Sequence, residues 1–385
     1  MIPYGKQDIN KEDIETVLET LKSDYLTQGP VVPKFENDIS NFCKSSFAVA
    51  VTSATAGLHL ACIALGLKKG DLLWTSPISF VASANCARYC GADVDFVDID
   101  PITYNIDPLL LEKKLMVARE NNKLPKIIIP VHLCGHPADM EKIYALSREY
   151  DFKIIEDASH AIGATYKNQP VGNCQFSSFT IFSFHPVKII TTGEGGVITT
   201  NNDKLARKVR LLRSHGITRD KEEMVSESHG DWYYQQLFLG FNYRLTDIQA
   251  ALGISQLKRI KKFVNKREEI SKIYDKELSS LPLTIPQQKS YVKSSRHLYV
   301  IRIKNNLSRL NHSKVFHELR KLNIMVNLHY IPIHLHPYYR SLGFDNGDFP
   351  NSEKYYEEAI SLPIYYQLTE EKQKFVIESI KRLVL

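Results

Sequence analysis

The sequence predicts an α/β protein, with a mostly parallel central sheet in a large domain and a smaller α+β C-terminal domain. Two observations support this fold class. Between residues 72 and 199, short β-rich runs alternate with helical stretches, and this order is typical of a parallel sheet covered on both faces. After residue 255 the alternation stops, and proline-containing segments, one strand and helices follow. We therefore expect a large domain over residues 1–255 and a small domain over residues 256–385.

The central sheet is predicted from runs rich in β-branched and aromatic residues. These runs are Leu72–Thr75, Val94–Val97, Ile127–Val131, Lys153–Glu156, Ser178–Phe182 and Gly196–Thr199. Helices are expected between several of them, such as Phe80–Cys90 and Met140–Tyr150. Because ligands bind beyond the carboxyl ends of parallel strands, we look for a site in the loops that follow these runs.

Further helices are predicted on either side of the sheet region. Asn10 can cap an amphipathic helix that carries Ile14, Val17, Leu18 and Leu21 on one face. A long helical stretch runs from Leu245 to about Tyr274 and leaves the sheet region. The C-terminal part is then expected to contain a strand at Leu298–Ile303, a helix at Ser313–Leu322 and a last helix from Glu370.

The composition is that of an ordinary globular protein. The chain has 385 residues, of which 24% are charged, and its formal net charge is +6. Lysines and arginines are mixed with acidic residues, so we expect no nucleic-acid partner, although the excess of cations suits an anionic substrate. No apolar run has the length of a membrane span, and the first residues lack the pattern of a secretory signal.

The six cysteines show no zinc-knuckle spacing, which favours reduced thiols in the cytoplasm. Cys86 and Cys90 share one face of a predicted helix, and metal ligation is the alternative to small buried thiols there. The buried thiols are favoured, so we expect no metal.

The chemistry is predicted from a lysine in a turn. No dinucleotide-binding G-x-G-x-x-G follows an early strand, and no P-loop is present. Instead, a strand ends at Phe182, Pro186 stiffens the turn, Lys188 projects, and the glycine-rich Thr191–Gly196 lets the backbone pass close to a flat ligand. A lysine held in a water-poor loop loses its proton readily and can form a Schiff base. The alternative is an ordinary solvated lysine, and the other residues expected near Lys188 must decide between the two interpretations.

The first companion is Asp157, which follows a predicted strand in the segment Glu156–Ala161. A carboxylate in this position keeps the pyridine nitrogen of pyridoxal 5′-phosphate (PLP) protonated, which makes the ring an electron sink. His160 can hydrogen-bond the phenolic oxygen of the cofactor. Taken alone, an acidic residue at the end of a strand is more often a helix cap.

The second companion is the run Ser53, Ala54 and Thr55, which opens a predicted helix from Leu58 to Leu67. Backbone N–H groups and the helix dipole make such a turn a phosphate site, with simple N-capping as the alternative. A third companion, Phe80, is a candidate to stack on the pyridine ring, with a core aromatic as the alternative.

Together these segments resemble the DegT/DnrJ/EryC1/StrS family of PLP-dependent sugar aminotransferases, which have the fold-type I architecture. The matching segments occur in family order: Leu26–Pro30, Ser53–Thr55, Glu156–Ala164, Phe182–Lys188, Arg213–Gly216 and Gly240–Gly253. The resemblance therefore spans most of the predicted large domain.

The resemblance implies further roles. Lys188 would hold the cofactor as a Schiff base and carry a proton between the cofactor and C4 of the sugar. Ser183 would contact the cofactor phosphate from the same subunit, and Asn242 would reach the phosphate across a homodimer interface. Dehydratases of the family carry histidine in place of the lysine, so Lys188 favours transamination.

Within the family, the resemblance is strongest to members of pseudaminic acid biosynthesis, through Ser53–Thr55, Lys293–Tyr299 and His329–His334. It implies that the segment from Lys293 crosses back toward the site. The residues it implies around the nucleotide-sugar are Tyr4, Tyr25, Leu26, Thr27, His329 and Tyr330. A solvated, histidine-rich loop is the alternative for Ile331–His336.

The sequence-based hypothesis is therefore transfer of an amino group from an amino acid, glutamate, to the C4 ketone of a UDP-linked 2-acetamido-2,6-dideoxy-4-keto-hexose. A UDP-4-keto-pentose and a GDP-linked 4-keto-6-deoxymannose are the alternative substrates. A PLP-binding regulator or silent sugar-binding protein is a more distant alternative, and the set Asp157, His160 and Lys188 argues against it.

Overall fold

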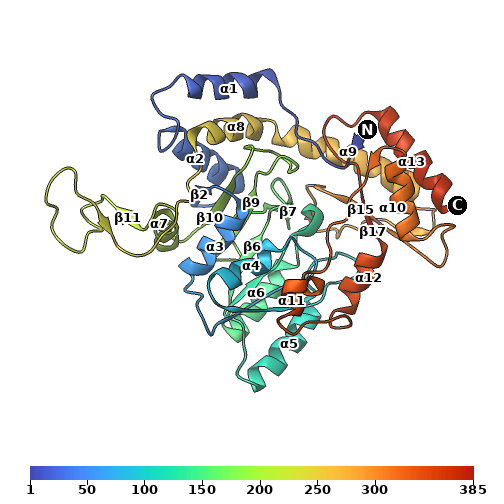
Figure 1. Ribbon diagram of the computed structural model, residues 1–385, viewed down its shortest axis with the longest axis horizontal. Coiled ribbons are helices and arrows are strands. Elements are labelled where there is room, and N and C mark those ends of the chain that lie inside the picture. Colours follow the sequence, from blue (N-terminus) through green and yellow to red (C-terminus); the bar gives the residue numbers. More distant parts are fainter.

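The computed structural model describes residues 1–385 and is built around a seven-stranded sheet (Figure 1). In spatial order its strands are β2 (Phe47–Val51), β10 (Gly196–Thr200), β9 (Phe179–Ser183), β6 (Lys153–Asp157), β5 (Ile127–Ile129), β3 (Leu72–Thr75) and β4 (Asp93–Phe96). The five strands from β9 to β4 are parallel, and only β10 runs against its neighbours. The predicted α/β class with a mostly parallel sheet is confirmed.

Two features of this sheet differ from the expectation. Strand β2 lies at one edge and was not among the predicted runs. Strand β10 is antiparallel to β9, because the connection between them, residues 184–195, contains no helix. A parallel return needs a long crossover, and this connection has none, so the chain turns straight back. Lys188 lies in this connection.

Helices cover both faces of the sheet, because alternate strand residues point to opposite sides. In β2, Val49 and Val51 join one core cluster, whereas Ala48 and Ala50 join another. The first face is covered by α3 (Ala54–Ala64), α4 (Ala82–Tyr89) and α7 (Asp203–Leu212). The opposite face is covered by α2 (Val31–Cys43), α8 (Asp247–Lys258), α5 (Pro108–Glu120) and α6 (Met140–Tyr150).

The predicted N-terminal helix is present as α1 (Lys11–Leu21), capped by Asn10, but its apolar face points outward. Ile14, Leu18 and Leu21 are 61%, 46% and 51% exposed. The buried side carries Asp13, which accepts a hydrogen bond from Gln256 of α8 at 2.7 Å and pairs with Arg259. The polar anchor, rather than the apolar residues, therefore fixes how α1 packs.

The predicted long helix is two helices, α8 and α9 (Ile260–Leu278), which meet at Arg259. The first half of α9 packs in the core of the large sheet, and its second half, from Ile270, packs in a second core formed by Ile2 and residues 270–384. That core surrounds a three-stranded antiparallel sheet of β13 (Leu283–Thr284), β15 (Tyr299–Ile303) and β17 (Ala359–Leu362). The domain boundary at residue 255 stays a prediction.

The remaining elements are short or belong to the C-terminal part. The C-terminal part contains the helices α10 (His312–Lys321), α11 (Pro337–Arg340), α12 (Pro350–Glu358) and α13 (Glu370–Val384). A small sheet joins β14 (Val292–Lys293), β7 (Thr165–Tyr166) and β8 (Gln169–Pro170). Strand β1 (Ile2–Pro3) pairs with β16 (Ile324–Met325), which brings the N-terminal segment to the chain that leads into His329.

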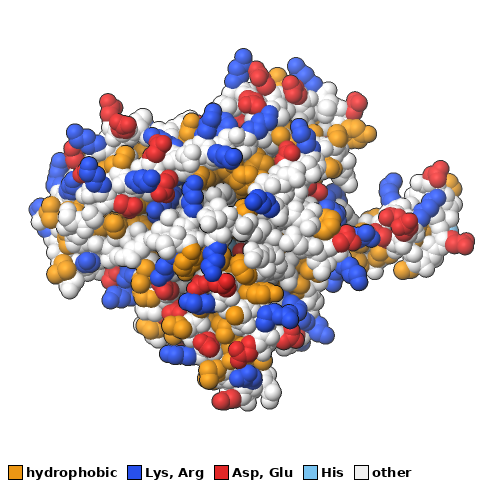
Figure 2. Space-filling model, turned by 180° about the vertical axis from the view of Figure 1, so that it is seen from behind, with side chains coloured by type: hydrophobic (Ala, Val, Ile, Leu, Met, Phe, Trp, Pro, Cys, Tyr) orange, Lys and Arg blue, Asp and Glu red, His pale blue; other side chains and the backbone are white.

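Residues 217–240, which we call the arm, project from the body of the molecule (Figures 1 and 2). The arm contains the strand pair β11 (Ile217–Thr218) and β12 (Gln235–Gln236). Figure 2 shows side chains of both charges scattered over that face rather than gathered in a block. None of the helices combines the length and the apolarity needed to cross a bilayer.

Candidate active site

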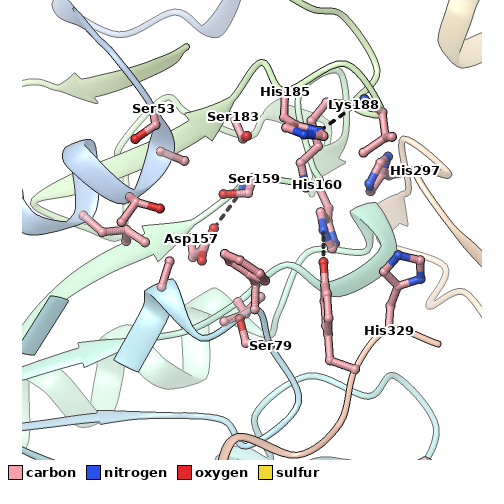
Figure 3. A pocket seen from close by; sticks show the side chains of 18 of the residues that line it. Ser53, Ser79, Asp157, Ser159, His160, Ser183, His185, Lys188, His297 and His329 are labelled. Carbon is pink, nitrogen blue, oxygen red and sulfur yellow. Dashed lines mark hydrogen bonds between the residues drawn. The ribbon is translucent and has the colours of Figure 1, made fainter. Parts of the chain in front are cut away.

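A cavity of about 530 Å³ opens beyond the carboxyl ends of β6 and β9 (Figure 3). It is the region in which parallel strands present their loops to a ligand. Most of the residues predicted for the site line it: Tyr4, Ser53, Ala54, Thr55, Phe80, Asp157, His160, Ser183, Lys188, His329 and Tyr330. Ser53 and Asp157 lie on one side of the cavity, and His297 and His329 lie on the other.

One end of the cavity is the first turn of α3. Ser53 caps this helix, because its Oγ accepts a hydrogen bond from Ala56 N at 3.1 Å. The N–H groups of Ala54 and Thr55 have no acceptor inside the helix and carry its positive dipole end. Gly196 supports this turn from below, since a Cβ on it would lie 2.6 Å from Ala54 N. Ser183, at the end of β9, adds a hydroxyl, so this end is suited to a phosphate.

Asp157 ends β6 and is 5% exposed. Its Oδ2 accepts from Ser83 Oγ at 2.6 Å, and its Oδ1 accepts from Ser159 N at 3.0 Å. These two donors compensate the burial of the carboxylate and fix its orientation toward the cavity. Phe80 also lines the cavity and is 59% exposed, so it is not the core aromatic of the alternative interpretation.

Lys188 lies in the connection after β9, in a turn whose backbone bond joins Lys188 N to His185 O at 2.9 Å. Its side chain is half-buried and lines the cavity. Burial lowers the pKa of Lys188 to about 8, and the charge of Asp157 opposes this shift. An amine with this pKa is partly neutral near physiological pH, which suits a nucleophile.

His160 is oriented differently from the expectation. Its Nδ1 accepts from Cys134 N at 3.3 Å, and its Nε2 lies 3.0 Å from the Tyr330 hydroxyl. Both ring nitrogens therefore have protein partners, and His160 and Tyr330 both line the cavity. Burial lowers the pKa of His160 well below its usual value, with the charge of Lys188 adding to the shift, so the ring is neutral.

Four predicted site residues do not line the cavity of their own chain. Tyr25, Leu26 and Thr27 lie in the loop between α1 and α2 and are exposed. The loop is held there by Asp247, whose N–H bonds to Leu26 O at 3.0 Å and whose Oδ1 accepts from Val32 N at 3.2 Å. Asn242 is exposed and forms an isolated bridge with Ser214, and its role across a dimer interface stays a prediction.

The cavity also contains residues that the sequence interpretation did not name for the site, chiefly Glu194, His297 and Asn327. His297 belongs to the segment expected to cross back toward the site, and its ring packs 4.4 Å from that of His160. The available signals were a histidine inside that segment and an amide two residues before His329. Neither residue type is specific enough to single out from sequence alone.

The chain matches the sequence profile of the DegT/DnrJ/EryC1/StrS aminotransferase family over residues 7–381. The chain belongs to this family. It is therefore a PLP-dependent sugar aminotransferase, and the resemblance seen in its motifs is confirmed over nearly its whole length.

Two relatives show how far the similarity extends. The aminotransferase is 43% identical to the protein MJ1066 of Methanocaldococcus jannaschii, covering 100% of this chain and 97% of that protein. It is 37% identical to the UDP-4-amino-4,6-dideoxy-N-acetyl-beta-L-altrosamine transaminase of Campylobacter jejuni, covering 99% of this chain and 96% of the relative.

Solved structures agree with this assignment. PseC of Helicobacter pylori, an aminotransferase of pseudaminic acid biosynthesis, superposes with a TM-score of 0.90 at 33% identity, covering 100% of this chain and 99% of PseC. The sugar aminotransferase Spr1654 of Streptococcus pneumoniae, in its PMP-form, has a TM-score of 0.90 at 30% identity, covering 100% and 99%. Spr1654 is also known in a PLP-form.

The residues that line the cavity fit PLP. The helix turn at Ser53–Thr55 and the free hydroxyl of Ser183 suit its phosphate, the buried carboxylate of Asp157 suits a protonated ring nitrogen, and Lys188 suits its aldehyde. When bound, PLP supplies a ring that accepts the electron pair released at the reacting carbon. The residues of the cavity would hold this ring and place an amine beside it.

Proposed function

We propose that this aminotransferase transfers the amino group of glutamate to C4 of a UDP-linked 2-acetamido-2,6-dideoxy-4-keto-hexose, as a step in the synthesis of a pseudaminic acid-type surface sugar. The observation that carries the chemistry is one cavity that holds Lys188, Asp157 and the helix turn at Ser53. The substrate is supported by the printed names of the C. jejuni transaminase and of PseC.

In this proposal Lys188 moves the protons. Its amine, with a pKa of about 8, can take a proton from one carbon and return it to another. Asp157, held by Ser83 and Ser159, would present its carboxylate to the ring nitrogen of the cofactor. Tyr4 and Tyr330 line the same cavity and would contact the sugar.

A panel of keto-sugar nucleotides tests the substrate. We expect the UDP-linked 2-acetamido-2,6-dideoxy-4-keto-hexose to give an amine with the highest kcat/KM. A UDP-4-keto-pentose and a GDP-linked 4-keto-6-deoxymannose serve as the competing substrates, and a higher kcat/KM for either one would replace the proposed sugar. Mass spectrometry of the nucleotide-sugar product measures each outcome. Lys188→Ala is the matched inactive control.

We further propose that the active unit is a homodimer with shared sites. The cavity of one chain contains no arginine to meet a diphosphate, whereas the arm carries the exposed Arg219. The arm also exposes Val225, Trp232 and Leu239, which are 87%, 75% and 81% accessible in a single chain. Apolar side chains exposed together on a projecting segment are typical of a surface that a partner covers.

Mixing two impaired variants tests the shared site. Lys188→Ala lacks the reactive amine, and Asn242→Ala lacks the side chain proposed to reach the partner's cofactor phosphate. A mixed dimer keeps one complete site, so random exchange of subunits should restore activity at about a quarter of all sites. Mixtures that stay as inactive as the separate variants, although subunit exchange is verified, would contradict sites that need both chains.

A further inference from the structure

Two buried serines form a chain of hydrogen bonds that ends on Asp157. Ser83 Oγ donates to Asp157 Oδ2 at 2.6 Å, and Ser79 Oγ lies 2.7 Å from Ser83 Oγ. All three side chains are buried, and Ser83 has no exposed surface. Because bulk water does not reach Ser83, its hydroxyl depends on these two protein partners.

The direction of each hydrogen bond follows from the number of hydrogens. A serine hydroxyl has one hydrogen, and a carboxylate oxygen can only accept. Since Ser83 gives its hydrogen to Asp157, its oxygen accepts from Ser79, whose single hydrogen is then used as well. The chain therefore runs in one direction, from Ser79 through Ser83 to the carboxylate. The distance of 2.6 Å at its end is typical of a hydroxyl that donates to a charged oxygen.

The backbone fixes the turn that carries both serines. Ser83 N donates to Phe80 O at 3.2 Å, so the chain from Ser79 to Ser83 turns tightly into α4. Just before this turn, Pro77 O accepts from Ile333 N at 2.8 Å, a contact from the C-terminal part of the chain. The turn is therefore anchored at its start and closed by its own hydrogen bond, and this places both hydroxyls relative to Asp157.

Only one of the two serines reaches the cavity. Ser79 lines it together with Asp157, whereas Ser83 does not (Figure 3). Ser83 therefore cannot touch a ligand in the cavity, and its hydroxyl acts on such a ligand through Asp157. The other oxygen of the carboxylate, Oδ1, accepts from Ser159 N at 3.0 Å. Each oxygen thus has one protein donor, and the serine chain supplies the donor for Oδ2.

We propose that Ser83 and Ser79 are positioning residues that act through Asp157, holding its Oδ2 and supporting its negative charge so that the ring nitrogen of PLP keeps its proton. Hydrogen bonds to a carboxylate favour its charged form, so a carboxylate that loses such a donor binds a proton more readily. The proton between the carboxylate and the ring nitrogen would then shift toward the carboxylate, and the ring would accept electrons less well. This inference rests on the proposed role of Asp157.

Nitrogen NMR of the protein loaded with PLP tests this inference, with nitrogen-15 in the pyridine ring and no substrate present. The signal of this nitrogen differs between its protonated and unprotonated states, and it is followed from pH 7 to pH 10. In Ser83→Ala the signal should leave the protonated position about one pH unit lower than in the wild-type protein, because a hydrogen bond to a charged group changes an equilibrium about tenfold. Signals of Ser83→Ala and wild type that coincide at every pH would overturn the inference.

A double-mutant cycle tests whether Ser79 acts through Ser83. Ser79→Ala should shift the signal in the same direction by about half a pH unit, because Ser83 loses the donor that orients its hydroxyl. In the Ser83→Ala background the same change should have no effect, since no hydroxyl remains there to accept. An equal shift in both backgrounds would contradict the chain. If Ser83→Ala binds no PLP, Ser79→Ala alone decides, and an unchanged signal in it would overturn the inference.

Two further variants complete the experiment. Ser147→Ala is the matched control, since Ser147 is a buried helical serine outside the cavity whose hydroxyl donates only to Tyr144 O at 2.7 Å, and it should give the wild-type signal. Asp157→Asn removes the charge itself, so the ring nitrogen should be largely unprotonated at pH 8. An unchanged signal in Asp157→Asn would contradict the proposed site. A shifted signal there, with unshifted signals in both serine variants, would contradict only the role of the serines.

Discussion

Lys188 is the residue on which the proposed chemistry depends, and its environment predicts how PLP capture should change with pH. Its pKa is lowered to about 8 by burial, and only the neutral amine attacks an aldehyde. The rate at which the cofactor-free protein captures PLP should therefore rise through about pH 8 and level off above it. Asp157→Asn removes the charge that raises this pKa, so the midpoint should move to lower pH.

Stopped-flow absorbance of the lysine-linked cofactor measures both midpoints. The comparison uses the midpoint rather than the amplitude, because Asp157→Asn also weakens the contact to the ring nitrogen. A wild-type midpoint near 10.5, the ordinary value for lysine, would contradict a pKa lowered by burial.

The sequence revealed residues whose roles are tied to local motifs. Asp157 ends a strand and Lys188 follows another, and both positions can be inferred from neighbouring residues. Asn327 and Ser361 meet only because β17 lies beside the segment leading to His329, and no local pattern reports that contact. The same limit explains His160, whose partner Tyr330 is 170 positions away.

At the scale of elements, the turn between β2 and α3 depends on the strand beside it. Gly196 begins β10, and a Cβ there would meet Ala54 N at 2.6 Å and Ser53 C at 2.6 Å. Gly196→Ala should therefore displace the turn that is suited to the phosphate and weaken PLP binding at least tenfold, because backbone atoms cannot yield as a flexible side chain can.

Equilibrium titration of the cofactor-free protein with PLP measures this change. Gly5→Ala is the matched control, since a Cβ there meets nothing closer than 3.8 Å. Equal affinity for PLP in both variants would show that the turn does not depend on close contact with β10.

The sequence predicted where several helices and strands lie along the chain better than it predicted how they pack against one another. The buried strand β5 is a continuous apolar run of three isoleucines, and the predicted helix at Met140–Tyr150 matches α6. The edge strand β2 and the helices α2 and α7 were missed and lie outside the region of alternating strands and helices, and α5, which lies inside that region, was not singled out. The outward apolar face of α1 was also not evident, because it depends on the partners of Asp13 in α8 and at Arg259.

At the scale of the whole molecule, several histidines are buried in the neutral state. Burial lowers the pKa of His136 to about 4 and that of His329 to about 3, and it lowers the pKa of His160 and His297 well below the usual 6.5. Below about pH 6.5 the unfolded chain binds protons that the folded chain cannot. Stability should therefore be complete above that pH and fall as the pH falls toward 4.

Thermal unfolding of the protein between pH 8 and pH 5 measures this dependence. His136→Asn should flatten the decrease in Tm, because it removes one of the histidines whose pKa is lowered by burial. His136 does not line the cavity, so this change leaves the site residues in place. His317→Asn is the control, since His317 is exposed, and it should leave the slope unchanged. A Tm that is constant down to pH 5 would contradict the burial of neutral histidines.

The most direct test of the whole account follows one nitrogen atom. The purified protein, loaded with PLP, is given glutamate with an isotopically labelled amino group and a UDP-linked 2-acetamido-2,6-dideoxy-4-keto-hexose, and the nucleotide sugar is examined by mass spectrometry and NMR. The account predicts the labelled nitrogen on C4 of the sugar, and none in Lys188→Ala. Unlabelled keto-sugar recovered from the wild-type protein, with PLP bound and glutamate unconsumed, would contradict it.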